Sequence, residues 1–399
     1  MTGTEPAART QPMARTCPFD PPPEYRTLRE EEPVASATLP DGLPGWLVTR
    51  YEDVRAVLSD PRFSSRRRQI RIGGDVPKDA PVPPPAPGMF IMTDPPEHTR
   101  FRRLLTGQFT VRRMQQLAPA VEQIVAERLA AMAGAEGPVD LVQSFALPIP
   151  SLVICELLGV PYSDREEFQR NSAMLLRIDA GPEEVQQAQQ AMNRFMHRLV
   201  LAKRAEPGDD ILSGLVSSGG LTDEELVGVG GLLLIAGHET TANMIALSTL
   251  CLLRNPDQLD ALRADPSLMD AAVEELLRYL SVIQFGIRRT AAEDLELNGQ
   301  QIKAGTTVVA AIQSGNRDVA QFPGDPDRLD LHRTYRPHLA FGHGIHQCLG
   351  QQLARVELKA ALTALFDRFP TLRLAVPVEE IPMRDDMVVY GVHELPVTW

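Results

Sequence analysis

One cysteine near the C-terminal end of the chain is enclosed by glycines. It is Cys348, in the stretch Phe341-Gly-His-Gly-Ile-His-Gln-Cys-Leu-Gly350. Glycine has no Cβ and tolerates unusual dihedrals, so these glycines let the backbone approach the sulfur closely. A helix-like apolar repeat runs from Gln351 to Phe366, and its N-terminus would point a positive dipole at the cysteine. Because a thiolate needs such surroundings at neutral pH, the pattern predicts one anionic sulfur presented to a metal.

Other roles compete for this cysteine. An isolated cysteine is usually a buried structural residue, although that role would not need the surrounding glycines. A zinc site is an alternative, since His338, His343 and His346 lie nearby, but the sequence lacks a paired Cys-x-x-Cys. A cysteine nucleophile with a remote histidine is a third alternative.

A short run of polar residues lies inside a long apolar segment. Thr222-Asp-Glu-Glu225 has capping-box spacing and the apolar pattern continues to Arg254, which predicts a buried helix of about 30 residues, about 45–50 Å long. The block Ala236-Gly-His-Glu-Thr-Thr241 interrupts it. Burying such polar groups without partners is costly, and glycine inside a helix costs roughly 1 kcal/mol more than alanine. Two penalties at one place predict a ligand site.

These two motifs carry a family resemblance. The spacing Phe-x-x-Gly-x-x-x-Cys-x-Gly resembles the haem-binding loop of the cytochrome P450 family, and Ala-Gly-x-Glu-Thr is similar to its oxygen-binding groove. The resemblance implies a mainly α fold, a large helical bundle with small β-sheets, that binds haem b (iron protoporphyrin IX). It implies that Cys348 is the axial ligand of the haem iron and that Phe341 shields the sulfur. It also implies haem contacts for Ala236, Gly237, Gly342 and Gly350, with Gly237 opening the helix beside the haem.

The resemblance also implies a catalytic acid–alcohol pair, Glu239 and Thr240. Thr240 would hydrogen-bond the bound dioxygen, and Glu239 would relay protons from solvent. The alternative is that Thr240 and Thr241 only bond back to backbone carbonyls. Glu239 would then be a buried charge without an explanation.

Further positions match residues that hold the cofactor or support its loop. His98 and Arg102 share a face of the helix that Asp94-Pro-Pro96 begins. Both residues, together with Arg289 and His346, match positions that bind haem propionates. Glu275 and Arg278 match the Glu-x-x-Arg pair of the family. Arg328 is expected to complete that pair as a structural trio, although Leu329 stands where phenylalanine is more common.

The substrate pocket is expected to be apolar. By position, its lining would be Ile91, Leu232, Ile235, Phe285 and Ile287, with the loop 81–90 as a lid. Ordinary core packing is the alternative for each residue. The resemblance implies a monooxygenase that inserts one oxygen atom from O2 into a hydrophobic small molecule by hydroxylation or epoxidation. We expect a macrolide, polyketide or other secondary metabolite, as in antibiotic biosynthesis. A peroxide-driven peroxygenase and a haem-binding sensor or scaffold remain alternatives.

The remaining elements and the composition fit this reading. Apolar periodicity predicts helices over 51–58, 111–133, 149–158 and 166–204 (broken at 181–182), then short strands after residue 286, but no doubly wound sheet. The stretch 78–88 contains five prolines and is expected to be a loop. We expect a disordered tail over 1–16 and a single domain over 17–399.

Charge and apolar content restrict the partners. A net charge of −12 argues against nucleic-acid binding, and four scattered cysteines favour a reduced compartment. The longest apolar stretch is far shorter than the ~20 residues of a membrane span, and no signal-peptide pattern begins the chain. We therefore expect a cytoplasmic protein without a membrane partner, and a monomer. The resemblance implies a ferredoxin and its reductase as electron donors, steered by Arg100, Arg103, Arg112 and Arg113.

Overall fold

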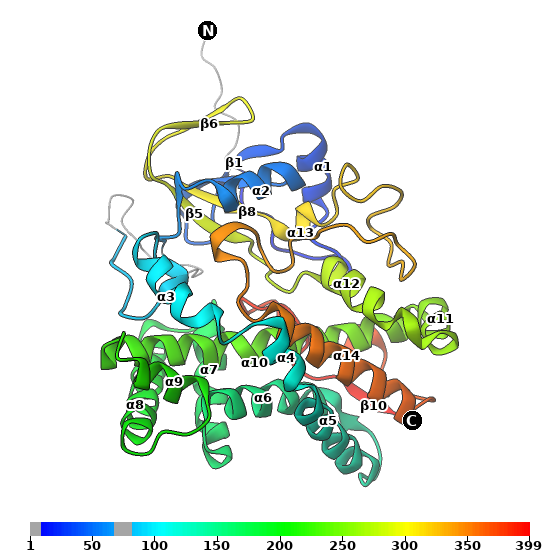
Figure 1. Cartoon of the computed structure of the whole chain (residues 1–399). Coiled ribbons are helices and arrows are strands. Elements are labelled where there is room, and N and C mark those ends of the chain that lie inside the picture. The colour runs from blue at the N-terminus through cyan, green and yellow to red at the C-terminus, as the bar shows by residue number, and fades with distance from the viewer. Residues whose placement is uncertain (1–8, 68–81) are drawn as a thin grey trace.

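Helices dominate the computed structural model, which describes residues 9–67 and 82–399 (Figure 1). In this part of the chain the α-helices are α1 (Glu24–Glu31), α2 (Tyr51–Ser59), α3 (Glu97–Thr106), α4 (Val111–Gln116), α5 (Ala118–Ala133), α6 (Pro148–Leu158), α7 (Arg165–Leu176), α8 (Pro182–Ala205), α9 (Ile211–Ser218), α10 (Asp223–Arg254), α11 (Pro256–Ala264), α12 (Met269–Leu280), α13 (Ile312–Gly315) and α14 (Gln351–Arg368).

The strands form small sheets at the edges of the helical body. They are β1 (Val34–Thr38), β2 (Pro44–Val48), β3 (Phe63–Ser64), β4 (Val139–Asp140), β5 (Ile287–Ala291), β6 (Leu295–Leu297), β7 (Gln300–Ile302), β8 (Thr307–Ala310), β9 (Arg373–Leu374) and β10 (Pro396–Thr398). Among the described residues the largest sheet has the order β1-β2-β8-β5-β3, with β2 and β8 parallel and the other pairs antiparallel. The expected mainly α fold with small sheets is confirmed.

The long helix α10 runs through the centre of the helical body. It crosses the middle of Figure 1, with α6, α8 and α14 packed against it. Its start follows the predicted capping box, because Thr222 Oγ1 accepts from the Glu225 amide at 3.2 Å and Glu225 Oε2 accepts from the Thr222 amide at 3.0 Å. The largest apolar cluster surrounds α10, and a second one lies between α2 and the five-stranded sheet. Any group held by α10 and by the start of α14 is therefore central.

Two predicted elements differ from the structure. The helix predicted over 111–133 is divided at Leu117 into α4 and α5, and Pro119 lies in the first turn of α5, where a missing amide hydrogen is tolerated. The tail over 387–399, whose sequence is also typical of strands, forms only β10 and isolated bridges. The Pro-rich stretch 78–88 lies partly outside the described residues. Within the described residues, no helix is both long and apolar enough to cross a bilayer.

The prediction of a disordered tail over 1–16 is wrong for its second half. Residues 1–8 lie outside the described part, but the segment from Arg9 onward is paired with the edge strand β1. The Gln11 amide donates to the Thr38 carbonyl at 2.9 Å, and the Thr38 amide donates to Arg9 at 2.7 Å. Arg15 stacks over the Tyr390 ring, 3.8 Å from its centroid. An unpaired strand edge attracts a further strand, and the polar composition of this segment conceals that pairing.

Candidate active site

The loop that carries Cys348 is shaped by two glycines and supported by α2. Gly342 and Gly344 have φ angles of +69° and +74°, which side chains with a Cβ rarely adopt. A Cβ on Gly344 would also lie 2.5 Å from the Leu58 carbonyl oxygen at the end of α2. Gly350 has an ordinary φ of −85° and open space around it, so the backbone does not require glycine there. The Cys348 amide donates to the Phe341 carbonyl at 2.9 Å and closes the loop.

A cluster that the sequence did not reveal fixes Phe341. The Arg355 guanidinium lies 4.6 Å from the centre of the Phe341 ring, and its Nη2 donates to Glu274 Oε2 at 3.0 Å. His338 Nε2 lies 3.2 Å from the same carboxylate oxygen. Burial of Glu274 opposes its ionisation, but the hydrogen bonds from His338 and Arg355 outweigh it and lower the pKa of Glu274 to about 2. The cluster ties α12 and α14 to the loop.

The sulfur of Cys348 faces a hollow inside the protein. Cys348 has an exposed surface, yet desolvation by burial raises the pKa of its thiol. A residue can be both exposed and surrounded by protein only if it borders a space inside the protein. We infer that Cys348 lines such a space. A hydrogen bond from the Gly350 amide, and then the charges of Arg102 and Arg355, act in the opposite direction and favour the thiolate. The arrangement suits a soft metal centre placed over the sulfur.

The opposite wall is a stripe along α10. Most of this helix is buried, but Ala236 is exposed and Leu232 and Thr240 are half-buried. These three residues are four apart and share one face of the helix. Alanine in the middle of a buried helix can be exposed only if space adjoins it. The stripe therefore lines a hollow, as the interrupting polar block predicted.

Gly237 has a different role from the predicted one. A Cβ at this position would lie 2.8 Å from Ile154 Cδ1, so its free side faces α6 and not an open space. Glycine here lets α10 and α6 approach each other closely. The prediction that Gly237 opens the helix is corrected accordingly.

Positive charge gathers beside the hollow, and Asp94 is the acid that acts on it. His98 and His346 stack with ring centres 4.0 Å apart, and Ser65 Oγ lies 2.7 Å from His346 Nε2. Burial and then the neighbouring cations lower the pKa of His98 to about 4 and that of His346 to about 3. Burial also lowers the pKa of Arg289, and of Arg67, to about 10.

Among the described residues, Arg67 and Arg289 of this group bond to carbonyls and form no ion pair. Arg289 donates to the Arg288 carbonyl, and Arg67 donates to the carbonyls of Ser65 and Ile91. His98 Nε2 is buried and has no hydrogen-bond partner. Buried cations in excess of the nearby Asp94 carboxylate, together with an unpartnered ring nitrogen, favour a further anion at this place. Paired carboxylates of a cofactor would supply such an anion. His98, Arg102, Arg289 and His346 lie close enough to act on one another electrostatically, and their binding of a cofactor stays a prediction. Arg67, from a remote loop, is an additional member.

The structure does not support a zinc site, because the three candidate histidines have different partners. His338 bonds to Glu274, His343 lies 3.4 Å from Arg55 Nε, and His346 faces Ser65. Within residues 9–67 and 82–399, no group of three potential ligands could hold a metal ion.

The two residues of the acid–alcohol pair face different sides of α10. The Thr240 hydroxyl donates to the Ala236 carbonyl at 2.9 Å, which is the backbone bond of the alternative reading, but the side chain borders the hollow. Glu239 is only 3% exposed and is not an unexplained charge, because its Oε2 pairs with Arg384 Nη2 at 3.0 Å. Arg384 was not among the predicted site residues.

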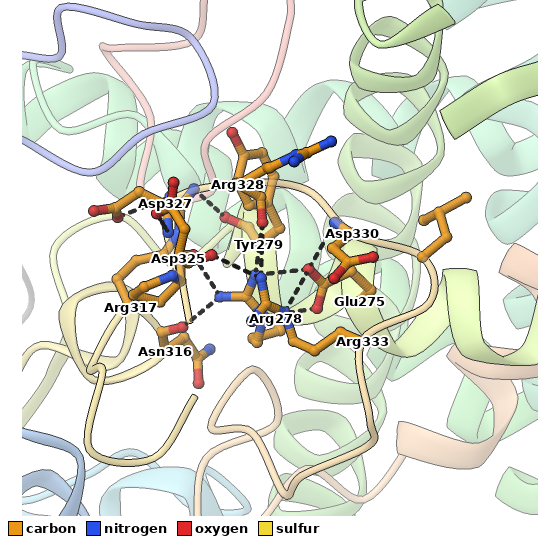
Figure 2. A network of polar contacts seen from close by, with 12 residues as sticks. Glu275, Arg278, Tyr279, Asn316, Arg317, Asp325, Asp327, Arg328, Asp330 and Arg333 are labelled. Atoms are coloured by element: carbon orange, nitrogen blue, oxygen red, sulfur yellow. Dashed lines mark hydrogen bonds and ion pairs between the residues drawn. The ribbon is translucent and has the colours of Figure 1, made fainter. Parts of the chain in front are cut away.

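The predicted structural trio is correct for two members and wrong for the third. Glu275 and Arg278 form a bidentate pair at 2.7 and 2.8 Å, both nearly fully buried. The third cation is Arg333, whose Nε lies 3.1 Å from Glu275 Oε1. The Arg328 side chain is 68% exposed and lies 3.8 Å from Asp257. Figure 2 shows Arg278 and Arg333 beside Glu275, with the Arg328 side chain directed away. Arg328 contributes through its carbonyl, which accepts from Arg333 at 3.1 Å.

The predicted pocket residues are only partly accessible. Leu232 and Ile235 on α10 are half-buried, Ile91 is exposed, and Ile287 is half-buried next to Gly342. Phe285 is 2% exposed, so its ring is covered by protein and does not line an open space. Its carbonyl is held by Gln11 Nε2 at 3.1 Å, from the segment predicted to be disordered.

A carboxyl group that the site does not use lies on α14. Glu357 is 1% exposed and its Oε2 has no hydrogen-bond partner. Burial raises its pKa well above the usual range, so the folded protein keeps the proton. The unfolded chain releases this proton above about pH 4.3. The unfolded state then binds fewer protons than the folded state, and stability is lost as the pH rises.

Replacing Glu357 with glutamine should remove this loss. The free energy of unfolding of the variant relative to the parent should rise with pH, by up to about 1.4 kcal/mol per pH unit, because the amide has no proton to release. Urea unfolding at several values between about pH 5 and 8 measures the difference. The exposed Glu379→Gln variant is the control and should show a much smaller change. A difference for Glu357→Gln that does not vary with pH would contradict the prediction.

These features define a class of protein: a helical protein that presents one thiolate to a large anionic cofactor between α10 and the loop before α14. Comparison with known proteins names the family. The model of the family "Cytochrome P450" matches residues 169–397. The chain is 50% identical to "Cytochrome P450-SU2" of Streptomyces griseolus, over 99% of this chain and 98% of that protein. It is 43% identical to "20-oxo-5-O-mycaminosyltylactone 23-monooxygenase" of Streptomyces fradiae, over 97% and 92%.

Solved structures agree. The structure of CYP105P1 in complex with filipin I superposes with a TM-score of 0.94 at 48% identity, covering 98% of this chain and 99% of the other. The chain belongs to the cytochrome P450 family. Its activity is therefore that of a haem-thiolate monooxygenase, with a small-molecule substrate, dioxygen and redox partners.

Proposed function

We propose that this enzyme inserts one oxygen atom from O2 into a hydrophobic small molecule, by hydroxylation or epoxidation. The observation that carries the proposal is that Cys348 and the Leu232–Ala236–Thr240 stripe, distant in sequence, both border internal space in an otherwise buried core. The half-buried Leu232 and Ile235 support an apolar substrate. The relative named for 20-oxo-5-O-mycaminosyltylactone supports a macrolide, polyketide or other secondary metabolite.

We assign haem b as the cofactor, with Cys348 as its axial ligand. Haem with a thiolate ligand supplies the cleavage of the O–O bond. The protein would supply the rest of the environment: Phe341, fixed by Arg355, covers the sulfur, and the amide of Gly350 stabilises its negative charge. Arg102, Arg289 and Arg67 would neutralise the cofactor carboxylates, and His98 and His346 would donate hydrogen bonds to them.

Thr240 and Glu239 would manage protons. The Thr240 hydrogen is already donated to Ala236, so the oxygen lone pairs are available to accept a hydrogen bond within the hollow. The Thr240 hydroxyl can then accept a hydrogen bond from a proton donor and orient that donor toward dioxygen. Glu239 would bring protons from the solvent side of α10.

Replacing Thr240 with alanine should uncouple electron consumption from product. Without the hydroxyl no lone pair orients the proton donor, so product per NADPH should fall roughly tenfold or more while hydrogen peroxide accumulates. The measurement uses a surrogate ferredoxin and reductase. Thr249→Ala is the matched control, since Thr249 makes the same backbone bond, to Ile245 at 2.9 Å, but lies in the buried part of α10. Equal product per NADPH in both variants would show that the Thr240 hydroxyl has only a structural role.

We further propose a ferredoxin and its reductase as electron donors. Of the four predicted docking arginines, Arg100 is paired with Glu225, and Arg113 with Gln108. Arg103 and Arg112 are exposed and have no side-chain partner among the described residues, so they remain the candidates. We also propose that the protein is a cytoplasmic monomer and that residues 17–399 fold as one domain.

The decisive experiment is spectroscopic. The purified protein, reduced and treated with carbon monoxide, should absorb at the wavelength typical of thiolate-ligated haem. A library of metabolites screened for a Soret shift then identifies molecules that displace the water ligand. Colourless protein, or a carbon monoxide complex without the thiolate band, would overturn the proposal.

A further inference from the structure

The catalytic acid of this enzyme is held by a cation from a remote segment. Glu239 Oε2 and Arg384 Nη2 are 3.0 Å apart, and their side chains are 4% and 11% exposed. Arg384 lies in residues 383–392, named here the C-terminal hairpin. Its two arms pair through a Met383–Val392 bridge and through the Arg384 amide, which donates to Gly391 at 2.9 Å. The position of the guanidinium therefore depends on the position of this hairpin.

The hairpin is seated directly on α10. Asn243, one turn after Glu239, donates from Nδ2 to the Glu239 carbonyl at 2.8 Å. A Cβ at Gly391 would lie 1.8 Å from Asn243 Oδ1, so only glycine permits this approach. Two independent contacts, the Arg384 ion pair and the Gly391–Asn243 packing, thus bring the hairpin to the same turn of α10.

The hairpin also touches two segments next to the proposed pocket. Its Val388 amide donates to the Leu176 carbonyl at the end of α7, at 2.9 Å, and Tyr390 donates to Val282 at 2.8 Å. Gln284, beside Phe285, donates to the Arg384 carbonyl at 3.2 Å. The hairpin therefore joins the end of α7, the segment before β5 and the catalytic acid in one bonded unit.

No other group neutralises Glu239. Its Oε1 lies 3.8 Å from His238 Nε2, beyond hydrogen-bond distance. His238 Nδ1 lies 2.7 Å from the Leu234 carbonyl, which can only accept, so Nδ1 carries the hydrogen of the neutral ring. Burial lowers the pKa of His238 and keeps the ring neutral, so Nε2 has no hydrogen to donate. Arg384 is the single positive charge in contact with this carboxylate among the described residues.

We propose that Arg384 is a positioning residue that holds the Glu239 side chain on the hairpin side of α10, and that proton relay depends on this ion pair. The inference rests on the proposed function. In each cycle the Glu239 side chain would take up a proton from the solvent side and release one toward the hollow, so it returns unchanged. Without the guanidinium, a buried carboxylate has no counter-charge and loses its fixed orientation.

Arg384→Gln and Arg384→Lys test the proposal, with Arg177→Gln as matched control. Arg177 also lies against the hairpin, through its bridge with Met387, but its side chain pairs with Asp179 at the surface. The probe is the metabolite with the largest Soret shift in the screen above. In Arg384→Gln, product per NADPH should fall about tenfold with release of peroxide. Arg384→Lys should restore a large part of the coupling, and Arg177→Gln should match the parent.

Turnover driven by added hydrogen peroxide separates positioning from damage. Peroxide brings its own protons, so Arg384→Gln should keep the parent rate in this assay. Loss of both activities together would show a merely structural role and overturn the proposal, as would unchanged coupling in Arg384→Gln. Failure of the parent to consume NADPH in response to the probe would instead overturn the proposed function.

A readout without turnover tests the pair itself. Urea unfolding of Glu239→Gln, Arg384→Gln and the double variant forms a double-mutant cycle. The double variant should lose less stability than the sum of the two single losses, because each single variant leaves one buried charge unpaired. Additive losses would overturn the claim that the two residues act as a unit.

Discussion

Replacing Cys348 with serine should abolish both monooxygenase turnover and the thiolate band of the reduced carbon monoxide complex. Serine has nearly the same volume, so the loop closed by the Cys348 amide and Phe341 carbonyl remains intact. Its hydroxyl is not ionised at neutral pH and is a hard ligand, so the electron donation that favours O–O cleavage is lost. The absorption spectrum and NADPH-dependent product formation measure the two effects.

A second cysteine provides the control for that experiment. Cys17 is half-buried and lies outside the site, so Cys17→Ser should keep both the band and the turnover. Far-ultraviolet circular dichroism establishes that both variants are folded. A thiolate band that persists in the Cys348→Ser protein would mean that another residue ligates the iron.

Replacing Arg278 with alanine should cost about 3–5 kcal/mol of the free energy of unfolding, the largest stability change expected among the substitutions considered. The guanidinium is 2% exposed, and its loss leaves the Glu275 carboxylate buried with fewer partners. It also removes donors to the carbonyls of Asn316 and Pro326, at 2.7 and 2.9 Å, in the segment that leads to the cysteine loop. Urea unfolding followed by circular dichroism measures the loss.

Arg328→Ala is the matched control and should cost about 0–1 kcal/mol, because that side chain is largely exposed. Should Arg278→Ala fail to accumulate, Arg278→Lys serves instead, since a point charge cannot replace the bidentate contact. Equal stability of the Arg278 and Arg328 variants would show that the trio is assembled differently.

The features that the sequence predicted correctly depend on residues that are close together in the chain. The capping box at Thr222, the apolar length of α10 and the glycine-enclosed cysteine each depend on neighbours within a few residues. The same holds for the Glu275–Arg278 pair on one turn of α12. Such patterns are readable because helix geometry fixes which spacings meet.

What the sequence missed depends on segments that meet only in the folded chain. Arg384 lies 145 residues from Glu239, and Arg67 reaches His346 from a remote loop. Arg333 takes the place expected for Arg328 because its side chain turns toward Glu275, whereas Arg328 offers only its carbonyl, which accepts from Arg333. No periodicity in the sequence carries such information.

The gathering of unpaired cations beside Cys348 has a consequence for how the cell makes this enzyme. Before a cofactor binds, the guanidinium groups of Arg67, Arg102 and Arg289 lie around the neutral rings of His98 and His346, and Asp94 is the carboxylate that opposes their charge. The newly made polypeptide is thus electrostatically strained, and insertion of a doubly negative porphyrin relieves that strain. A porphyrin that binds only the folded chain stabilises it, so we expect the lifetime of the polypeptide against proteases to increase with the supply of the prosthetic group.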